Sequence, residues 1–104
     1  MAGFRISAIA SARLDEIFAY SRDAWGEARA EAYIRGLFDC FASIARGEAP
    51  ARPVPAEFGI DGHYCRYQRH YVYWRRLSDD HIGIVTILHE RMHQTDRFRD
   101  DIES

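Results

Sequence analysis

The chain contains 104 residues, of which 47% are hydrophobic and 29% are charged, and its formal net charge is −2 at pH 7. This length and composition indicate a single domain, residues 1–104, of a soluble globular protein, and no apolar run approaches the roughly eighteen residues of a membrane span. All fourteen basic residues are arginine, which excludes Schiff-base chemistry and a phosphate-loop lysine, and the net negative charge argues against a protein that works mainly by neutralising phosphates.

The first half of the chain predicts one strand and two helices. Apolar and polar residues alternate over residues 4–8, as in a half-buried strand. Apolar residues then recur at helical spacing from a predicted N-cap at Ser11 to a break at Gly26, and again over residues 34–45 until Gly47. Two helices joined at one glycine predict an antiparallel hairpin.

The second half of the chain changes from helical spacing to strand-like runs. Residues 48–62 carry three prolines and two glycines, which predicts a loop that crosses the domain. Three successive strand-like runs follow and predict an antiparallel meander, namely His63–Gln68, Tyr71–Leu77 and His81–His89. The sequence therefore predicts an α+β fold in which the helix hairpin covers one face of a four-stranded sheet.

The string His89-Glu90-Arg91-Met92-His93 has the letters of the H-E-x-x-H zinc motif. That motif requires a helix, which places both imidazoles one turn apart with the glutamate beside the metal-bound water. Here the string follows the apolar run Ile82–Leu88, and the eleven residues after it offer no histidine as a third ligand. We therefore interpret it as a strand end that runs into a polar tail, and we expect no metal.

Two observations bear on the cellular compartment. The N-terminus lacks an apolar h-region and is interrupted by Arg5, so we expect no signal peptide and a cytoplasmic location. Cys40 and Cys65 have no partner at C-x-x-C spacing and are interpreted as reduced thiols.

The histidines at predicted strand starts and turns are interpreted as surface or capping residues, namely His63, His70 and His81.

Several strings in this order are characteristic of one family. They are residues 14–20 leading to Trp25-Gly26, Ala28 and Ala32 with Tyr33-Ile34, Tyr71–Arg75, and Ile82–Met92. Together with the predicted element order they resemble the ParE-like branch of the RelE/ParE toxin superfamily over nearly the whole chain. The last string is the most specific, because it is similar to the pattern I-x-I-x-x-I/V-L-H-x-R-M at the end of the family's final strand.

The resemblance implies a toxin of a type II toxin–antitoxin pair, in a hetero-oligomer with a small ribbon-helix-helix antitoxin of the ParD type whose disordered C-terminal segment folds onto it. ParE-like members are described as gyrase poisons, so we expect inhibition of DNA gyrase by binding, without a cofactor. RelE-like members are ribosome-dependent messenger-RNA endoribonucleases, and under this alternative the catalytic residues would be His89, Arg91 and His93. The absence of lysine and the net negative charge favour binding over cleavage.

Two sets of residues are candidates for partner surfaces. The predicted helix hairpin holds more large aromatic side chains than one face can bury, which predicts an antitoxin-binding set of Tyr20, Trp25, Tyr33 and Phe41. Arginines interleave with aromatic residues near and on the later strands, which predicts a target-binding set of Arg66, Trp74, Arg75 and Arg91. The alternation itself favours a simpler interpretation, in which these aromatics face the core and the arginines face solvent.

Overall fold

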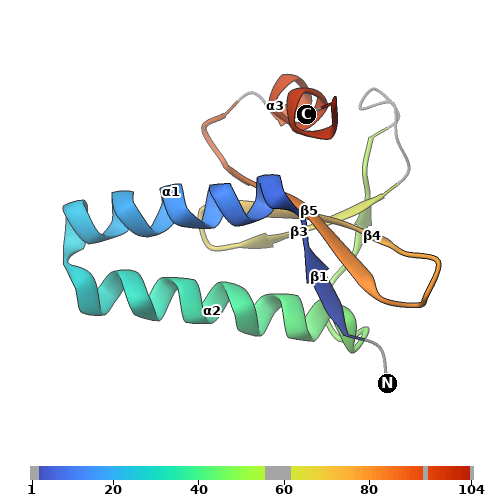
Figure 1. The fold of residues 1–104 in the computed structure, drawn as a ribbon, viewed down its shortest axis with the longest axis horizontal. Helices are drawn as coiled ribbons and strands as arrows, with labels where there is room; N and C mark the ends of the chain where they lie inside the picture. The colour runs from blue at the N-terminus through green and yellow to red at the C-terminus, as the bar shows by residue number, and fades with distance from the viewer. Residues whose placement is uncertain (1–2, 56–61, 93, 104) are drawn as a thin grey trace.

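The computed structural model describes residues 3–55, 62–92 and 94–103. Its elements are β1 (Phe4–Ile6), α1 (Ala8–Trp25), α2 (Glu27–Ala45), β2 (Arg52–Pro53), β3 (His63–Tyr67), β4 (His70–Arg76), β5 (Ile82–His89) and α3 (Gln94–Glu103). Figure 1 shows the α1–α2 hairpin beside the sheet, with its tip extending past the strands. The predicted α+β class is confirmed.

The helix hairpin is set by one capping serine and one glycine. The Ser7 hydroxyl oxygen accepts a hydrogen bond from the Ala10 amide at 3.0 Å and donates one to the Val85 carbonyl at 2.8 Å. Ser7 therefore ends the strand and begins α1, and the predicted cap at Ser11 was wrong. Gly26 joins the helices as predicted, at a φ of 96° that glycine adopts without a steric penalty.

The sheet has five strands in the order β1-β5-β4-β3-β2. The predicted meander is confirmed in β3, β4 and β5, which pair antiparallel in turn, with a tight turn at Gln68-Arg69 between β3 and β4. Strand β1 pairs with β5 in parallel. The predicted number of four strands was wrong, because Arg52–Pro53 in the predicted loop pairs with β3. Residues 56–61 of that loop lie outside the described residues.

A β-bulge changes which residues of strand β5 face the helix hairpin. Tyr73 pairs with Thr86 and Trp74 pairs with Ile84, so Val85 is the extra residue. Because side chains alternate along a strand, the extra residue reverses the alternation beyond it. Ile84 therefore faces the helix hairpin together with later residues of the opposite parity, such as Ile87.

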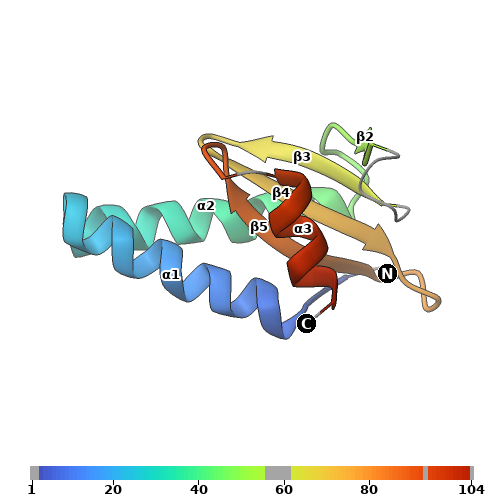
Figure 2. The ribbon, with the colours of Figure 1, turned by 90° about the horizontal axis from the view of Figure 1, so that it is seen from above.

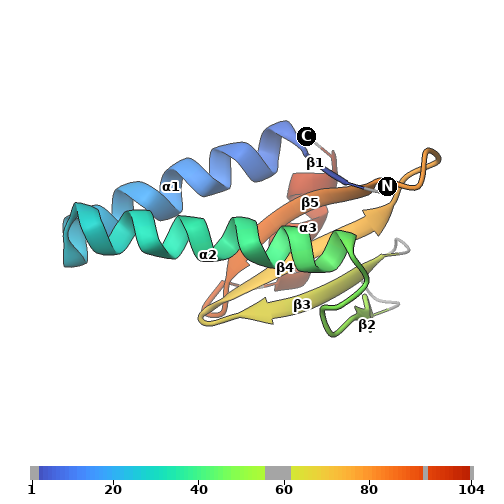
Figure 3. The same cartoon turned by 90° about the horizontal axis from the view of Figure 1, so that it is seen from below.

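The sheet separates two apolar cores. The larger core lies under the helix hairpin and includes Leu37, Phe41 and Trp74, all buried. The smaller core lies on the opposite face, where α3 places Phe98 against Tyr73 and Leu88. Figures 2 and 3 show the two layers, with α3 in front of the strands in the first view and α2 in front of them in the second.

Helix α3 corrects two expectations, a polar tail after the last strand and helices on one face only. Its sequence is mostly charged and offers the sheet only Phe98 and, four residues on, Ile102. That spacing places both on one helical face, but the apolar surface they cover is supplied by distant strands. No helix among the described residues is long and apolar enough to cross a membrane.

Candidate functional site

A groove of about 420 Å³ lies between the helix hairpin and the end of the sheet where β5 stops and β4 starts. It exists because the hairpin is longer than the strands and extends past them, as all three ribbon views show. The residues that line it are Arg13, Glu16, Ile17, Tyr20, Ser21, Trp25, Tyr33, Arg69, His70, Ile87, His89, Arg91 and Met92. Three of the four predicted antitoxin-binding residues are among them.

The helical wall of the groove carries two exposed aromatic side chains. Tyr20 is 67% exposed and Trp25 is 50% exposed. Their rings meet edge to face at 6.0 Å, and the Arg29 guanidinium lies over the Trp25 ring at 5.4 Å. A pair of large apolar rings held in a fixed geometry and left in water is typical of a protein-binding surface.

The floor of the groove is a polar cluster that the sequence analysis missed. The Tyr33 hydroxyl and the His70 Nδ1 atom form a hydrogen bond of 2.6 Å, and the His70 and His89 rings lie 5.1 Å apart. Burial, and next the neighbouring His89, lower the pKa of His70 to about 4, and burial raises the pKa of Tyr33. At neutral pH the Tyr33–His70 pair is therefore uncharged.

His70 was interpreted as a surface or capping residue, and that interpretation was wrong. It begins β4 and pairs in register with His89, so the sheet brings the two imidazoles together. The sequence gives only part of the information that this pairing requires. A two-residue turn at Gln68-Arg69 fixes the register of β3 against β4, but the register of β4 against β5 depends on the bulge at Val85.

His89 ends β5, as the interpretation of the zinc-like string predicted. The backbone turns directly after it, and the Arg91 amide donates a hydrogen bond of 3.1 Å to His89 Nδ1. Glu90 points to the arginines of the neighbouring turn and pairs with Arg66. His93 lies outside the described residues, and within the described part of the chain no group of three His, Cys, Asp or Glu side chains could hold a metal ion.

Arginines form the rim of the groove. Arg69 and Arg91 lie on the two turns at the sheet end, and Arg13 lies on α1. Arg69 is 3.6 Å from Glu90, and Arg13 is paired with acidic residues of α1 and α3. Within the described ranges, no carboxylate forms an ion pair with Arg91. Arg91 is therefore the rim arginine that no carboxylate of the described residues neutralises, at the edge of an apolar wall.

Phe41 is the antitoxin-binding prediction that the structure corrects. It is fully buried and contacts Phe4 edge to face at 5.7 Å. The reason is its place on α2, one turn after Leu37 and one turn before Ile44, on the stripe that faces the sheet. The exposed aromatic residue of this region is Phe38, on the neighbouring face of the helix.

The predicted target-binding residues do not form one surface. Trp74 is only 5% exposed and stacks on His63 at 4.7 Å, so its prediction as a surface residue was wrong. Arg66 lies at the groove end of the sheet, because Glu90 pairs with both Arg66 and Arg69. Arg75 lies at the other end of β4, where it pairs with Gly83.

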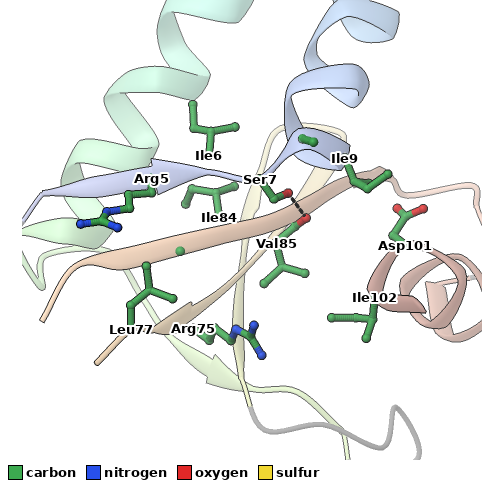
Figure 4. Close-up of a pocket in the computed structure, with 12 residues that line it drawn as sticks. Arg5, Ile6, Ser7, Ile9, Arg75, Leu77, Ile84, Val85, Asp101 and Ile102 are labelled. Atoms are coloured by element: carbon green, nitrogen blue, oxygen red, sulfur yellow. Dashed lines mark hydrogen bonds between the residues drawn. The ribbon is translucent and has the colours of Figure 1, made fainter. Parts of the chain in front are cut away.

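Arg75 instead borders a second hollow of about 340 Å³ between β1, β5 and α3. Figure 4 shows Arg75 of β4 and Asp101 and Ile102 of α3 beside it, whereas the Arg5 guanidinium points away from α3. Arg5 already pairs with Asp79, and Asp101 already pairs with Arg13. The groove is the stronger candidate for a functional site, because only the groove is lined by the exposed aromatic side chains Tyr20 and Trp25.

The fold and the groove define a small α+β protein whose open site is an apolar wall with a cationic rim, which is the chemistry of a partner-binding surface. Comparisons with known proteins identify the family. The family described as "ParE toxin of type II toxin-antitoxin system, parDE" matches residues 4–94. A curated Escherichia coli protein named "Toxin ParE" is 32% identical over 103 residues, which are 99% of each chain.

A solved structure titled "Chromosomal ParDE TA system from P. aeruginosa" has the same fold, with a TM-score of 0.67 at 17% identity, over 86% of this chain and 96% of that one. The chain belongs to the ParE toxin family of type II toxin–antitoxin systems.

Proposed function

We propose that this ParE-family toxin acts by binding DNA gyrase, and that a ribbon-helix-helix antitoxin neutralises it by laying its C-terminal segment in the groove. The proposal for the antitoxin rests on the exposed pair Tyr20 and Trp25. Arg91, which no carboxylate of the described residues neutralises, lines the same groove. The gyrase part rests on family membership, because ParE-like members are described as gyrase poisons.

The chemistry of the groove favours an amphipathic peptide as its occupant. Apolar side chains of such a segment would pack on Tyr20 and Trp25, and its acidic side chains would meet Arg69 and Arg91 at the rim. A disordered antitoxin tail that folds on binding would cover the wall along its length. We therefore assign neutralisation to the groove.

The floor of the groove favours inhibition by binding over RNA cleavage. A general base for cleavage near neutral pH needs a pKa near 7, and burial lowers the pKa of His70 to about 4, so His70 is unsuited to that role. The chain is also net negative, at −2, which disfavours tight binding of a polyanion. Binding to gyrase requires neither property.

The ribosome-dependent endoribonuclease alternative has one observation in its favour. Tyr33, His70 and His89 lie side by side at the floor, and Arg91 lines the same groove. An arginine beside two imidazoles could stabilise a phosphate and carry a proton. The experiments below therefore separate the two functions.

Antitoxin binding is tested with matched aromatic substitutions on the helix hairpin. Trp25→Ala and Tyr20→Ala remove the exposed wall, and we expect each to weaken antitoxin binding by about 2 kcal/mol, or roughly thirty-fold, in calorimetric titration. Phe38→Ala is the control, because Phe38 is an exposed aromatic residue of the same hairpin that does not line the groove. Equal affinities for all three folded variants would contradict the assignment.

The target is tested by expressing the toxin without antitoxin and by adding purified toxin to purified gyrase. We expect trapped gyrase–DNA cleavage complexes and loss of supercoiling, with Arg91→Ala weaker than wild type. Arg35→Ala is the control, since Arg35 is an exposed arginine of α2 outside the groove. Ribosome-dependent messenger cleavage that disappears in His89→Ala would establish the nuclease alternative.

A further inference from the structure

The chain has two cysteines, and the fold brings them together. Cys40 lies on α2 and Cys65 on β3, 25 residues further along the chain, and their Sγ atoms are 3.9 Å apart. Both are free thiols, as predicted, and neither lines the groove. Cys65 is buried and Cys40 is half-buried, so Cys40 is the more exposed residue of the pair.

The thiol pair belongs to a tightly packed interface between α2 and β3. Cys65 and Tyr67 lie on the same face of β3, because they are two residues apart. One helical turn before Cys40, a Cβ at Gly36 would overlap the Tyr67 hydroxyl and stand 2.7 Å from its Cζ atom. Tyr33, a further turn back, meets the Tyr67 ring at 5.2 Å. This packing fixes the helix against the strand and keeps the two sulfurs opposed.

The pair is also chemically asymmetric. The two thiols share a hydrogen bond in which either sulfur can be the donor, and this contact lowers the pKa of Cys40. The same hydrogen bond, together with burial, raises the pKa of Cys65. Cys40, the more exposed residue, is thus the thiol that deprotonates more readily. Cys65 is the buried thiol beside it.

We propose that Cys40 and Cys65 form a reversible intramolecular disulfide between α2 and β3 when the protein meets a hydroperoxide. In the first step the Cys40 thiolate attacks one peroxide oxygen, the O–O bond breaks, and Cys40 becomes a sulfenic acid while hydroxide leaves. In the second step the Cys65 sulfur attacks the Cys40 sulfur, the S–O bond breaks, and a second hydroxide leaves as the S–S bond forms. The hydroxides take up the two thiol protons, so that hydrogen peroxide is reduced to two waters.

Bond formation requires the sulfurs to approach from 3.9 Å to about 2.05 Å. The bond would close the chain segment between α2 and β3, which includes β2, and would join the helix to the sheet covalently. It would therefore stabilise the interface that carries Tyr33, the groove residue next to His70. This inference does not depend on the cellular target proposed above.

The experiment uses the full chain, reduced and then freed of reductant. One portion is treated with equimolar hydrogen peroxide, and both portions are alkylated with N-ethylmaleimide and weighed by intact mass spectrometry. We expect the treated protein to lose two hydrogens and accept no label, and a tryptic peptide with Cys40 to be linked to one with Cys65. We also expect a melting temperature higher by about 10 °C that dithiothreitol reverses.

Single variants test the order of events. In Cys65→Ala, Cys40 should stop at a sulfenic acid that dimedone labels, whereas in Cys40→Ala the buried Cys65 should remain a thiol under the same treatment. The proposal is overturned if the treated wild-type chain still accepts two labels, if it forms only disulfide-linked dimers, or if Cys40→Ala and Cys65→Ala react with peroxide at the same rate.

Discussion

The guanidinium of Arg13 on α1 donates hydrogen bonds to both carboxylate oxygens of Asp101 on α3, the shortest at 2.8 Å, across 88 residues of sequence. Both side chains are largely buried, and the hydrogen bond to Asp101 is the main reason that the pKa of Arg13 is raised. Asp101 also accepts a hydrogen bond of 2.7 Å from the Thr86 hydroxyl of β5. One carboxylate thus ties the last helix to the first helix and to the sheet.

Removing this carboxylate should destabilise the protein far more than removing a surface charge. Asp101→Ala leaves the Arg13 guanidinium and the fully buried Thr86 hydroxyl without this partner, and we expect a loss of about 2–3 kcal/mol in the free energy of unfolding. Glu48→Ala, which breaks the exposed pair with Arg46, should cost less than about 1 kcal/mol. Urea unfolding monitored by circular dichroism measures both, and similar losses would contradict this role.

Position 36 should require glycine because the Tyr67 ring leaves no room for a Cβ atom, and not because of the backbone conformation of Gly36. Gly36→Ala would raise the helix propensity of α2 by about 1 kcal/mol, but its Cβ would overlap the Tyr67 side chain, and we expect a net loss of about 1–2 kcal/mol. In a Tyr67→Ala background the overlap is absent, so the same substitution should stabilise the protein. A double-mutant cycle by chemical denaturation measures the change of sign. Destabilisation in both backgrounds would place the cause elsewhere.

Acidification should weaken the fold through His70. Its pKa falls from 6.5 to about 4 on folding, so protons bind the unfolded chain more tightly. The stability associated with neutral His70 is therefore complete above pH 6.5 and is lost as the pH falls towards 4. Partial exposure limits this loss to about 1–2 kcal/mol.

His70→Asn should flatten the dependence of the unfolding free energy on pH between 7 and 5. Tyr33→Phe is the matched control, because it removes the 2.6 Å hydrogen bond but leaves the imidazole in place, and it should keep most of the slope. A slope that survives in His70→Asn would assign the effect to another group.

The purified protein should contain no stoichiometric zinc. His89 ends a strand, its Nδ1 atom already accepts the Arg91 amide, and Glu90 pairs with Arg66, so the string from residue 89 to 93 does not begin as a helix. Elemental analysis after native purification should give far less than one zinc per chain, and chelation should leave the melting temperature unchanged. One tightly held zinc per chain would require a different arrangement of this segment.

Substitution of Arg91 or of Trp74, both predicted as target-binding residues, should reduce the toxicity of the protein, but for different reasons. Arg91→Ala removes an exposed side chain, so it should keep its stability within about 0.5 kcal/mol while toxicity falls. Trp74→Ala empties a core position and should cost about 3–5 kcal/mol, which removes toxicity by unfolding. Thermal melts beside growth assays separate the two, and a fully stable Trp74→Ala protein would contradict the core assignment.

The helix hairpin and the meander could be predicted because their signals are local. Helical periodicity ends at Gly26, and strand-like runs flank the turn at Gln68-Arg69. Helix α3 could not be predicted in the same way, because its stability depends on an apolar surface made by Tyr73 and Leu88, far away in sequence. Propensity and composition within a charged ten-residue segment carry no information on that surface.

Some residues of the candidate site could also be predicted from the sequence, and others could not. Tyr20 and Trp25 were predicted from an excess of aromatic side chains on the hairpin, and they are exposed in the groove. Phe41 met the same criterion, and Trp74 was predicted from the interleaving of arginines with aromatic residues, but both are buried, because residue type alone does not say which face of an element is covered. His70 was missed because its pairing with His89 depends on the bulge at Val85, a feature that alternation patterns do not encode.

The parallel pairing of β1 with β5 has a consequence for synthesis on the ribosome. Phe4 and Ile6 pair with Ile82 and Ile84, so β1 cannot pair until β5 has left the exit tunnel. Until then the nascent helix hairpin has no complete sheet to cover and exposes its apolar stripe. A chain released early, before residue 82, would lack both β5 and α3, so a prematurely terminated message would yield a product without the groove and subject to proteolysis.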